Sequence, residues 1–174
     1  MAGVKLLDWV NSGGGPLICA EVHISTQWMG INGLSKPSAS HKNDYERACR
    51  TQEYLEAMTC GAGYVLVLGD EPLQSSFFVT ESGNLAIARW VSAQSPEGLR
   101  QFLTGPVADR GDLAPAIPFD VSQGPLVLFD SALRGSDALA CCPKADVKPG
   151  SYHVTTEKWQ LERKFNFVVH RLLE

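Results

Sequence analysis

The sequence predicts an α+β fold in which antiparallel β-sheet predominates, with two or so short helices. Short runs of β-branched and aromatic residues recur along the chain, turn-forming residues separate them, and strands and helices do not alternate regularly. The 174 residues predict a single domain, 1–174, because domains commonly span roughly 100–200 residues.

The N-terminal part of the chain predicts a strand, a loop and a helix. Pro16–Ile24, with the sequence PLICAEVHI, is a largely apolar run after a glycine stretch and predicts a strand. Ser25–Asn43 is rich in Gly, Ser and Asn, which indicates a surface loop. In Asp44–Gln52 the apolar residues recur at helical spacing, so we expect a short helix capped by Asn43 or Asp44.

The middle of the chain predicts two hairpins and a second helix. Tyr54–Leu68 has strand signals on both sides of a Gly-Ala-Gly turn, although a helix that continues through Met58 is an alternative. Phe77–Val91 repeats the hairpin pattern around a Ser-Gly-Asn turn. The stretch SPEGLRQFL then predicts a helix that Ser95 caps and in which Pro96 takes the first helical position.

The last part of the chain predicts a connection followed by strands. Gly105–Pro118 contains several Gly and Pro residues and few apolar ones, which indicates an irregular segment. Strands are predicted in IPFDV (117–121) and PLVLFD (125–130). A Pro-Gly turn begins the alternating strand within 147–159, and 164–172 closes the chain as another strand.

The composition excludes several classes of protein. The formal charge of −4 argues against a nucleic-acid binder, because such proteins carry a basic surface. No apolar run approaches the roughly 20 residues that span a bilayer, so no membrane span is predicted. The N-terminus lacks the apolar core of a signal peptide, which predicts a cytoplasmic location. The cysteines lack the spacing of a zinc or redox motif, so we expect reduced thiols and no metal site at Cys19, Cys49, Cys60, Cys141 and Cys142.

A search for catalytic motifs finds no nucleophile elbow, no H-E-x-x-H pair and no phosphate-binding loop. The glycine runs precede strands and lack the helix N-terminus that would hold a phosphate, so no cofactor is predicted. Glu21 and His23 are two residues apart, which places them on one face of the first predicted strand. They could pair or bind a metal, and a plain His–Glu contact is the favoured interpretation.

Carboxylates follow two of the predicted strands. Asp70 and Glu71 come directly after the apolar run YVLVLG, and Asp130 ends the run PLVLFD. Such positions suit catalytic acids and bases, but Gly-Asp-Glu-Pro is also turn chemistry, and we favour the turn. Trp28, at the start of the long loop, is a candidate surface aromatic because Trp is enriched at binding hot spots.

The order of several short motifs resembles that of a known family. The motifs are SGGGPLI (12–18), WMG (28–30), DYERAC (44–49), VLVLGDEP (65–72), ARW (88–90), LFD (128–130) and PGSY (149–152). Together they are similar to the immunity protein 21 family of bacterial polymorphic toxin systems. The resemblance covers nearly the whole chain.

The resemblance implies a cytoplasmic protein that binds and neutralises a toxin of the same organism and needs neither catalytic residues nor a cofactor. The residues themselves suggest Trp28, Asp70, Glu71 and Asp130 as toxin contacts, since acidic groups would be attracted to a basic groove. The alternative is a small hydrolase with catalytic groups drawn from Asp70, Asp130, His23 or His153. A ligand-binding or structural β domain is a third interpretation.

Overall fold

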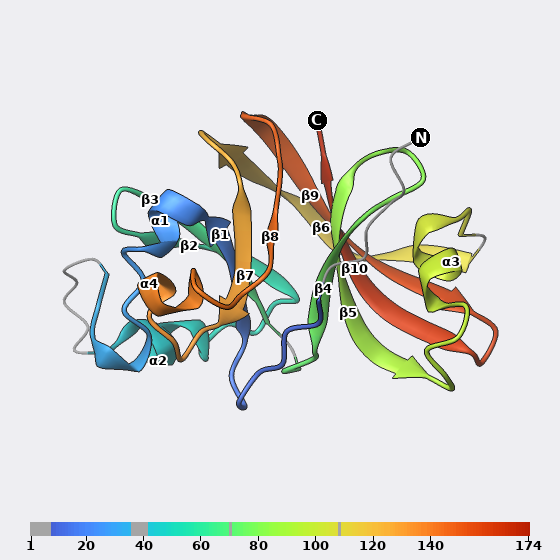
Figure 1. The fold of residues 1–174 in the computed structure, drawn as a ribbon, viewed down its shortest axis with the longest axis horizontal. Helices are drawn as coiled ribbons and strands as arrows, with labels where there is room; N and C mark the ends of the chain where they lie inside the picture. The colour runs from blue at the N-terminus through green and yellow to red at the C-terminus, as the bar shows by residue number, and fades with distance from the viewer. Residues whose placement is uncertain (1–7, 36–41, 70, 108) are drawn as a thin grey trace.

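The computed structural model describes residues 8–35, 42–69, 71–107 and 109–174, and its strands form two five-stranded sheets (Figure 1). The first sheet has the strand order β2-β3-β1-β7-β8, and the second has the order β4-β5-β10-β9-β6. Every strand pairing in both sheets is antiparallel. The predicted fold class is therefore confirmed.

The elements follow one another along the chain as a series of short segments. The first sheet is built from β1 (Leu17–Glu21), β2 (Leu55–Cys60), β3 (Gly63–Leu68), β7 (Leu126–Asp130) and β8 (Lys144–Ala145). The second is built from β4 (Ser75–Val79), β5 (Leu85–Ala93), β6 (Asp109–Val121), β9 (Gly150–Leu161) and β10 (Phe165–Leu173). The helices are α1 (Val22–Ser25), α2 (Asp44–Ala48), α3 (Leu99–Thr104) and α4 (Gly135–Ala138), with a 3₁₀ turn η1 (Gly30–Asn32).

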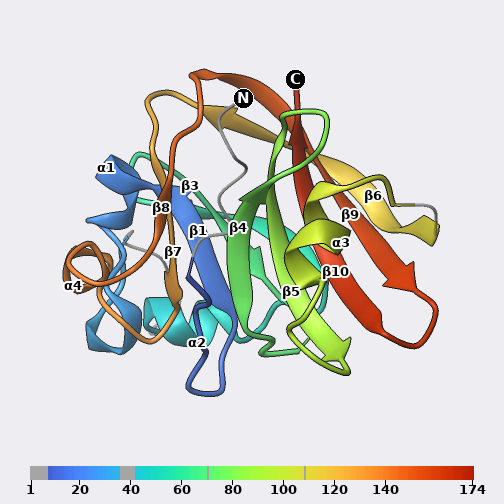
Figure 2. The ribbon, with the colours of Figure 1, turned by 45° about the vertical axis from the view of Figure 1, so that its right-hand side comes forward.

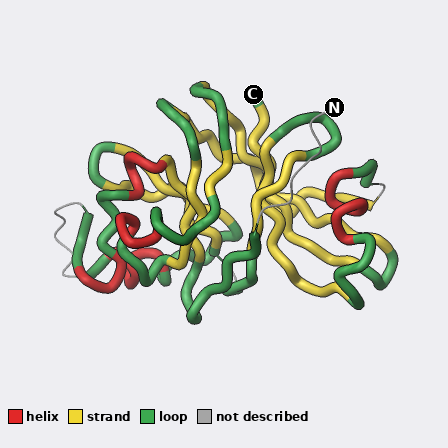
Figure 3. The backbone as a smooth tube through the Cα atoms, in the orientation of Figure 1, coloured by secondary structure: helices red, strands yellow, loops and turns green. Residues whose placement is uncertain are grey.

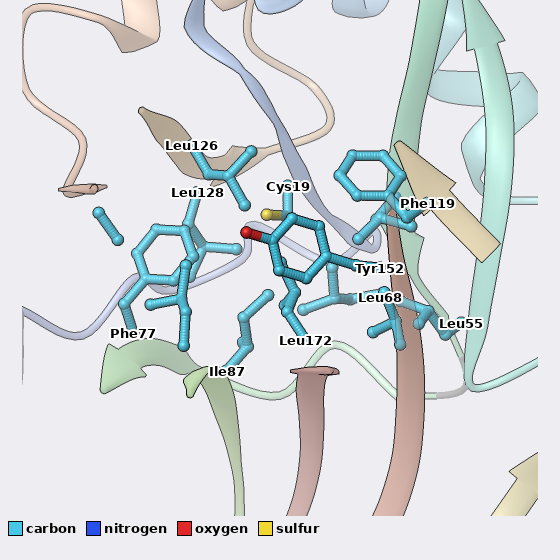
Figure 4. Packing of buried hydrophobic residues seen from close by; sticks show 14 of the residues in the cluster. Cys19, Leu55, Leu68, Phe77, Ile87, Phe119, Leu126, Leu128, Tyr152 and Leu172 are labelled. Carbon is cyan, nitrogen blue, oxygen red and sulfur yellow. The ribbon is translucent and has the colours of Figure 1, made fainter. Parts of the chain in front are cut away.

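The main hydrophobic core lies between the two sheets. Figure 4 shows side chains from both sheets meeting there, among them Cys19 and Leu68 of the first sheet and Ile87 and Tyr152 of the second. Every residue of β1 is buried, because alternate side chains enter this core and the opposite face of the sheet. A strand buried on both faces reads as a continuous apolar run, which is what LICA provides.

Helices cover the outer faces of both sheets. The helices α1, α2 and α4 contribute Ile24, Ala48 and Ala138 to a second cluster on the outside of the first sheet. On the outside of the second sheet α3 contributes Leu99, Phe102 and Leu103, which pack against aromatic side chains of β10. Figure 3 shows the helices at the two flanks with the strands between them, and Figure 2 shows α3 over β5 and β10.

Both predicted hairpins are confirmed as β2–β3 and β4–β5. Met58 lies within β2, so the alternative of a longer helix is wrong. The first predicted helix is confirmed but ends at Ala48, and Asn43 caps it. The Asn43 side chain accepts a hydrogen bond of 2.8 Å from the Glu46 amide, and the Glu46 carboxylate accepts one of 3.1 Å from the Asn43 amide.

The prediction of an irregular connection over Gly105–Pro118 is wrong, because β6 occupies most of it. This strand pairs only with β9 and lies at the edge of the second sheet, where a proline need not donate to a neighbour. The register shifts between Asp112 and Ala114 and again between Ala114 and Ile117, which accommodates the Pro-rich sequence as bulges.

Two predicted boundaries are also wrong. The first strand ends at Glu21 and not at Ile24, because the chain turns into α1 once the Val22 amide donates to the Pro125 carbonyl at 3.0 Å. The second helix begins at Leu99, with Gly98 as its N-cap at φ 77°, so Ser95 does not cap it. Glycine adopts this left-handed conformation without the steric cost that other residues meet.

Candidate functional site

Several of the sequence motifs meet at one edge of the first sheet. Leu17 begins β1 and pairs on one side with Leu68, near the end of β3, and on the other with Asp130, the end of β7. The glycine turn before β1, residues 13–15, therefore lies beside the ends of both strands. The sequence predicted the carboxylates that follow these strands, and the antiparallel pairing brings the two strand ends to the same edge.

An open cleft of about 150 Å³ lies at this edge. Its walls come from three segments: the glycine turn, the chain that follows α2, and the end of β3 with the turn beyond it. The lining residues are Gly14, Gly15, Pro16, Ala48, Cys49, Thr51, Leu68, Gly69, Glu71 and Pro72. We take this cleft as the candidate site because the exposed carboxylate of Glu71, which follows β3, and the exposed thiol of Cys49 border it.

Arg89 fastens the turn that follows β3. Its side chain projects from β5 in the second sheet, is 1% exposed, and donates to the carbonyls of Gly69 at 2.5 Å and Glu71 at 2.6 Å. It also donates to the Tyr54 carbonyl at 3.2 Å, just before β2. Sequence analysis missed this residue. The signal was a single Arg in the apolar strand LAIARWV, because a buried charge must find partners.

The predicted carboxylates differ in how they are used. Glu71 is exposed and lines the cleft, while Asp70 lies outside the described residues. Asp130 is half-buried, and its carboxylate accepts hydrogen bonds from the amides of Gly13 at 2.7 Å and Ala132 at 2.9 Å. Asp130 therefore joins the glycine turn to the chain after β7, which agrees with the turn interpretation.

The predicted surface position of Trp28 is wrong. Its side chain is fully buried in the outer cluster of the first sheet, and its indole N–H donates to the Ser131 carbonyl at 2.9 Å. Gly30, two residues on, has φ 58°, and a Cβ there would collide with the carbonyls of Ala132 and Leu133. The W-x-G motif thus packs the loop onto the chain that follows β7, and only glycine fits its last position.

Asp44 secures the rest of this loop. The carboxylate is completely buried and accepts hydrogen bonds of 2.9 Å from the amides of Met29 and Ser35. It also pairs with Arg47 at 2.8 Å, and the Arg47 guanidinium reaches the Thr59 carbonyl on β2 at 2.9 Å. The DYERAC motif therefore ties the loop and α2 to the first sheet, which fixes one wall of the cleft.

Tyr45 and Cys49 lie on the exposed side of α2, next to the glycine turn. A Cβ at Gly15 would lie 2.5 Å from the Tyr45 ring, so the ring packs directly over the glycine backbone. A hydrogen bond with Cys49 raises the pKa of Tyr45, and the negative charge that a Cys49 thiolate would carry acts in the same direction. The phenol is therefore protonated at neutral pH, and Cys49 presents an exposed thiol at the cleft.

Of the residues named for the hydrolase alternative, Asp130, His23 and His153 are described by the structure, and these three do not lie together. The end of β1 that pairs with Asp130 is Leu17, and the other end, Glu21, lies four residues or roughly 13 Å away. His23 follows that other end, so it lies far from Asp130. His23 lies in α1, so its predicted placement on the first strand is wrong, although its Nδ1 does lie 3.8 Å from Glu21. His153 is exposed on β9 in the other sheet.

A Glu–His–Ser cluster lies at that far end of β1. The Ser122 hydroxyl donates to the Glu21 carboxylate at 3.0 Å and stands 3.4 Å from His23 Nε2. Glu21 is almost fully buried and also accepts the amides of Ser122 at 2.9 Å and Gln123 at 2.6 Å. The Ser122 hydroxyl is closer to the carboxylate than to the imidazole, and the Glu21 carboxylate holds the β6–β7 turn through these hydrogen bonds.

Within the part of the chain that the structure describes, no three His, Cys, Asp or Glu side chains lie together in a way that could hold a metal ion. None of the described helices has the length and apolar character needed to span a membrane.

The sequence matches a known protein family. The model of the family Immunity protein 21 matches residues 8–164 of the 174-residue chain. The chain belongs to the Immunity protein 21 family. The matched range contains the whole cleft, together with Arg89, Asp44 and Trp28. For this Immunity protein 21 member, comparisons with curated proteins and with solved structures found no match.

Proposed function

We propose that this immunity protein binds a cognate toxin domain of the same organism and neutralises it by covering its active site. It acts in the cytoplasm of the producing cell and uses neither catalysis nor a cofactor. The family match supports the immunity role. The observation that carries the choice of surface is the cleft at the edge of the first sheet, where Glu71 is exposed on a turn that Arg89 fastens from below.

The electrostatics of the cleft favour a toxin with a basic surface. Glu71 is exposed, and the sequence places Asp70 directly before it. An exposed carboxylate on a fixed segment, such as that of Glu71, increases the rate at which a positively charged partner associates. A toxin that acts on nucleic acid has a basic groove of this kind, so its substrate site is the surface that the cleft would cover.

We assign direct toxin contact to Asp70 and Glu71, and a supporting role to the other two candidates. The Asp130 carboxylate already accepts two backbone amides, so its contribution is to hold the glycine turn that forms one wall of the cleft. The buried Trp28 contributes through packing beneath the loop. Replacement of either residue is expected to act on toxin binding through the shape of the cleft.

Co-expression tests the function itself. The tagged protein is produced with the toxin domain encoded beside its gene, and both the recovery of a stoichiometric complex and the growth of the host are measured. A complex together with restored growth supports the immunity role. A toxic neighbour that is neither bound nor neutralised would contradict it.

Charge reversal tests the choice of surface. We expect Glu71→Lys to lower the association rate constant with the toxin by about 10-fold at low salt, with a smaller effect at high salt because ions screen the interaction. Glu81→Lys is the matched control, since Glu81 is also an exposed carboxylate and lies in the β4–β5 turn. Equal rate constants for the two variants would remove Glu71 from the interface.

A further inference from the structure

A second surface of the molecule has the features of a binding pocket for one side chain. It lies between the two sheets, where the β2–β3 hairpin faces β6, and has a volume of about 250 Å³. Ala57 and Tyr64 line it from the first sheet, and Pro118, Phe119 and Asp120 line it from the second. It is distinct from the cleft described above, with which it shares no lining residue.

The floor of this pocket is apolar and belongs to the core. Phe119 is 3% exposed and packs in the cluster between the sheets. Figure 4 shows it in the same part of the cluster as Leu68 and Leu55 of the opposite sheet. Above this floor Tyr64 stands 58% exposed, which makes it one of the two most exposed large hydrophobic residues of the described chain. An exposed aromatic ring beside an apolar hollow is the arrangement found at the hot spots of protein interfaces.

Polar groups at the rim of the pocket are available to a partner. Asp120 is exposed, and it is the one charged residue among the five that line the pocket. Within the described part of the chain, no hydrogen bond or ion pair occupies the Asp120 carboxylate or the Tyr64 phenol. The pocket thus offers the ring and phenol of Tyr64, and the Asp120 carboxylate stands at its outer rim because Asp120 leaves β6 on the opposite face from Phe119.

The backbone around the pocket favours recognition of a side chain over addition of a strand. Pro118 lies on β6, the edge strand of the second sheet, and has no N–H to donate to a further strand. The register of β6 is also shifted close to this point, at Ile117. A bulged edge that contains proline is a poor template for another strand.

We propose that this pocket receives an arginine side chain of the cognate toxin, so the inference rests on the proposed function. The aliphatic part of the arginine packs over Pro118 and Phe119, the guanidinium stacks on the Tyr64 ring, and the Asp120 carboxylate binds it through two hydrogen bonds. Arginine fits better than lysine because its planar guanidinium both stacks and binds a carboxylate in bidentate fashion. The formal charge of −4 on the chain also favours a basic partner.

The pocket and the cleft are close enough for one toxin to contact both. Tyr64 and Leu68 lie four residues apart on β3, a separation of roughly 13 Å. A protein interface of ordinary size covers about 800 Å² on each partner, a patch roughly 28 Å across, which is wider than this separation. The arginine pocket would then anchor the toxin, while Glu71 accelerates its association.

Binding measurements with the toxin domain encoded beside the gene test this inference. We expect Tyr64→Ala to raise the dissociation constant about 30-fold, and Asp120→Asn about 10-fold, because each removes part of a desolvated contact. For Tyr64→Phe the dissociation constant should stay within about 3-fold of the wild-type value, since phenylalanine keeps the aromatic ring. The matched controls are Asp112→Asn, an exposed carboxylate on the same strand, and Leu161→Ala, an exposed apolar residue remote from the pocket.

The outcomes separate this inference from the proposed function. If wild-type protein binds the toxin and the Tyr64 and Asp120 variants bind equally well, the pocket is not part of the interface although the immunity role stands. If the wild-type protein binds no toxin, the proposed function fails and the inference fails with it. Replacing each toxin arginine with lysine in turn identifies the arginine that enters the pocket. With that arginine replaced, Asp120→Asn should no longer weaken binding. If no arginine behaves in this way, the assignment is overturned.

Discussion

At the scale of single residues, Arg89 has the largest structural role that the sequence did not reveal. Its guanidinium is buried between the sheets and donates to carbonyl oxygens on both sides of the turn after β3. Those carbonyls no longer contact water, so each would cost free energy without a hydrogen-bond donor, and the buried guanidinium charge would cost free energy without acceptors. The residue therefore connects the second sheet to the segment that presents Glu71.

Removal of this side chain should destabilise the whole fold. We expect Arg89→Met to lower the free energy of unfolding by about 3 kcal/mol, because the Gly69 and Glu71 carbonyls lose their charged donor while the apolar volume is largely kept. Urea denaturation measures this change, with Arg110→Met as the exposed control. Equal stabilities of the two variants would mean that these hydrogen bonds contribute nothing net.

At the scale of elements, the sequence predicted the structures whose signal is local. The β2–β3 and β4–β5 hairpins have their turns and alternation within about fifteen residues, and the cap of α2 lies within four. The strand β6 was missed because its prolines are acceptable only at a sheet edge, which is a property of the tertiary fold. The helices α1 and α4 have four residues each, too few for a periodic pattern.

The same limit applies to the candidate site. The sequence indicated Glu71 and Asp130, because carboxylates after apolar runs mark strand ends. It could not show that Asp130 is used by the amides of Gly13 and Ala132, since the first of these lies 117 residues away. Trp28 was misplaced for a similar reason, as its indole N–H finds the Ser131 carbonyl 103 residues along the chain.

The β9–β10 hairpin contains a histidine that makes stability depend on pH. His170 is completely buried, its Nδ1 lies 3.0 Å from the Thr156 hydroxyl, and burial lowers its pKa well below 6.5, with the nearby charge of Arg89 acting in the same direction. Between the folded and unfolded pKa values the unfolded chain binds a proton that the folded chain does not. The stability that the neutral, buried His170 contributes is therefore fully present above pH 6.5 and is lost as the pH falls below 6.5.

Urea denaturation at a series of pH values measures this effect. We expect the free energy of unfolding to fall by up to about 1.4 kcal/mol per pH unit below pH 6.5 through this group. His170→Asn should flatten the slope, whereas His153→Asn, at an exposed position on β9, should not. A slope that survives in the His170 variant would assign the proton uptake to another group.

At the scale of the whole molecule, exposed cysteines mark both the cleft and the chain after α4. The cleft lies at the edge where β1 begins, and the chain after α4 carries the exposed thiol of Cys141. Cys49 is also exposed, and it lines the cleft itself. The buried thiols Cys19 and Cys60 react slowly in comparison, because burial raises the pKa of Cys60 to about 11 and that of Cys19 further. Two accessible cysteines at different places on the fold thus report on which surface a toxin covers.

Thiol labelling with and without the toxin domain uses this difference. We expect bound toxin to reduce maleimide modification of Cys49 at least about 10-fold, because an interface of ordinary size excludes solvent and reagent from its centre. Modification of Cys141, quantified by mass spectrometry of the same digest, should stay unchanged and serves as the internal control. Protection of Cys141 with full reactivity at Cys49 would place the toxin on the α4 flank, whereas protection of Cys49 alone would locate it over the cleft that Glu71 borders.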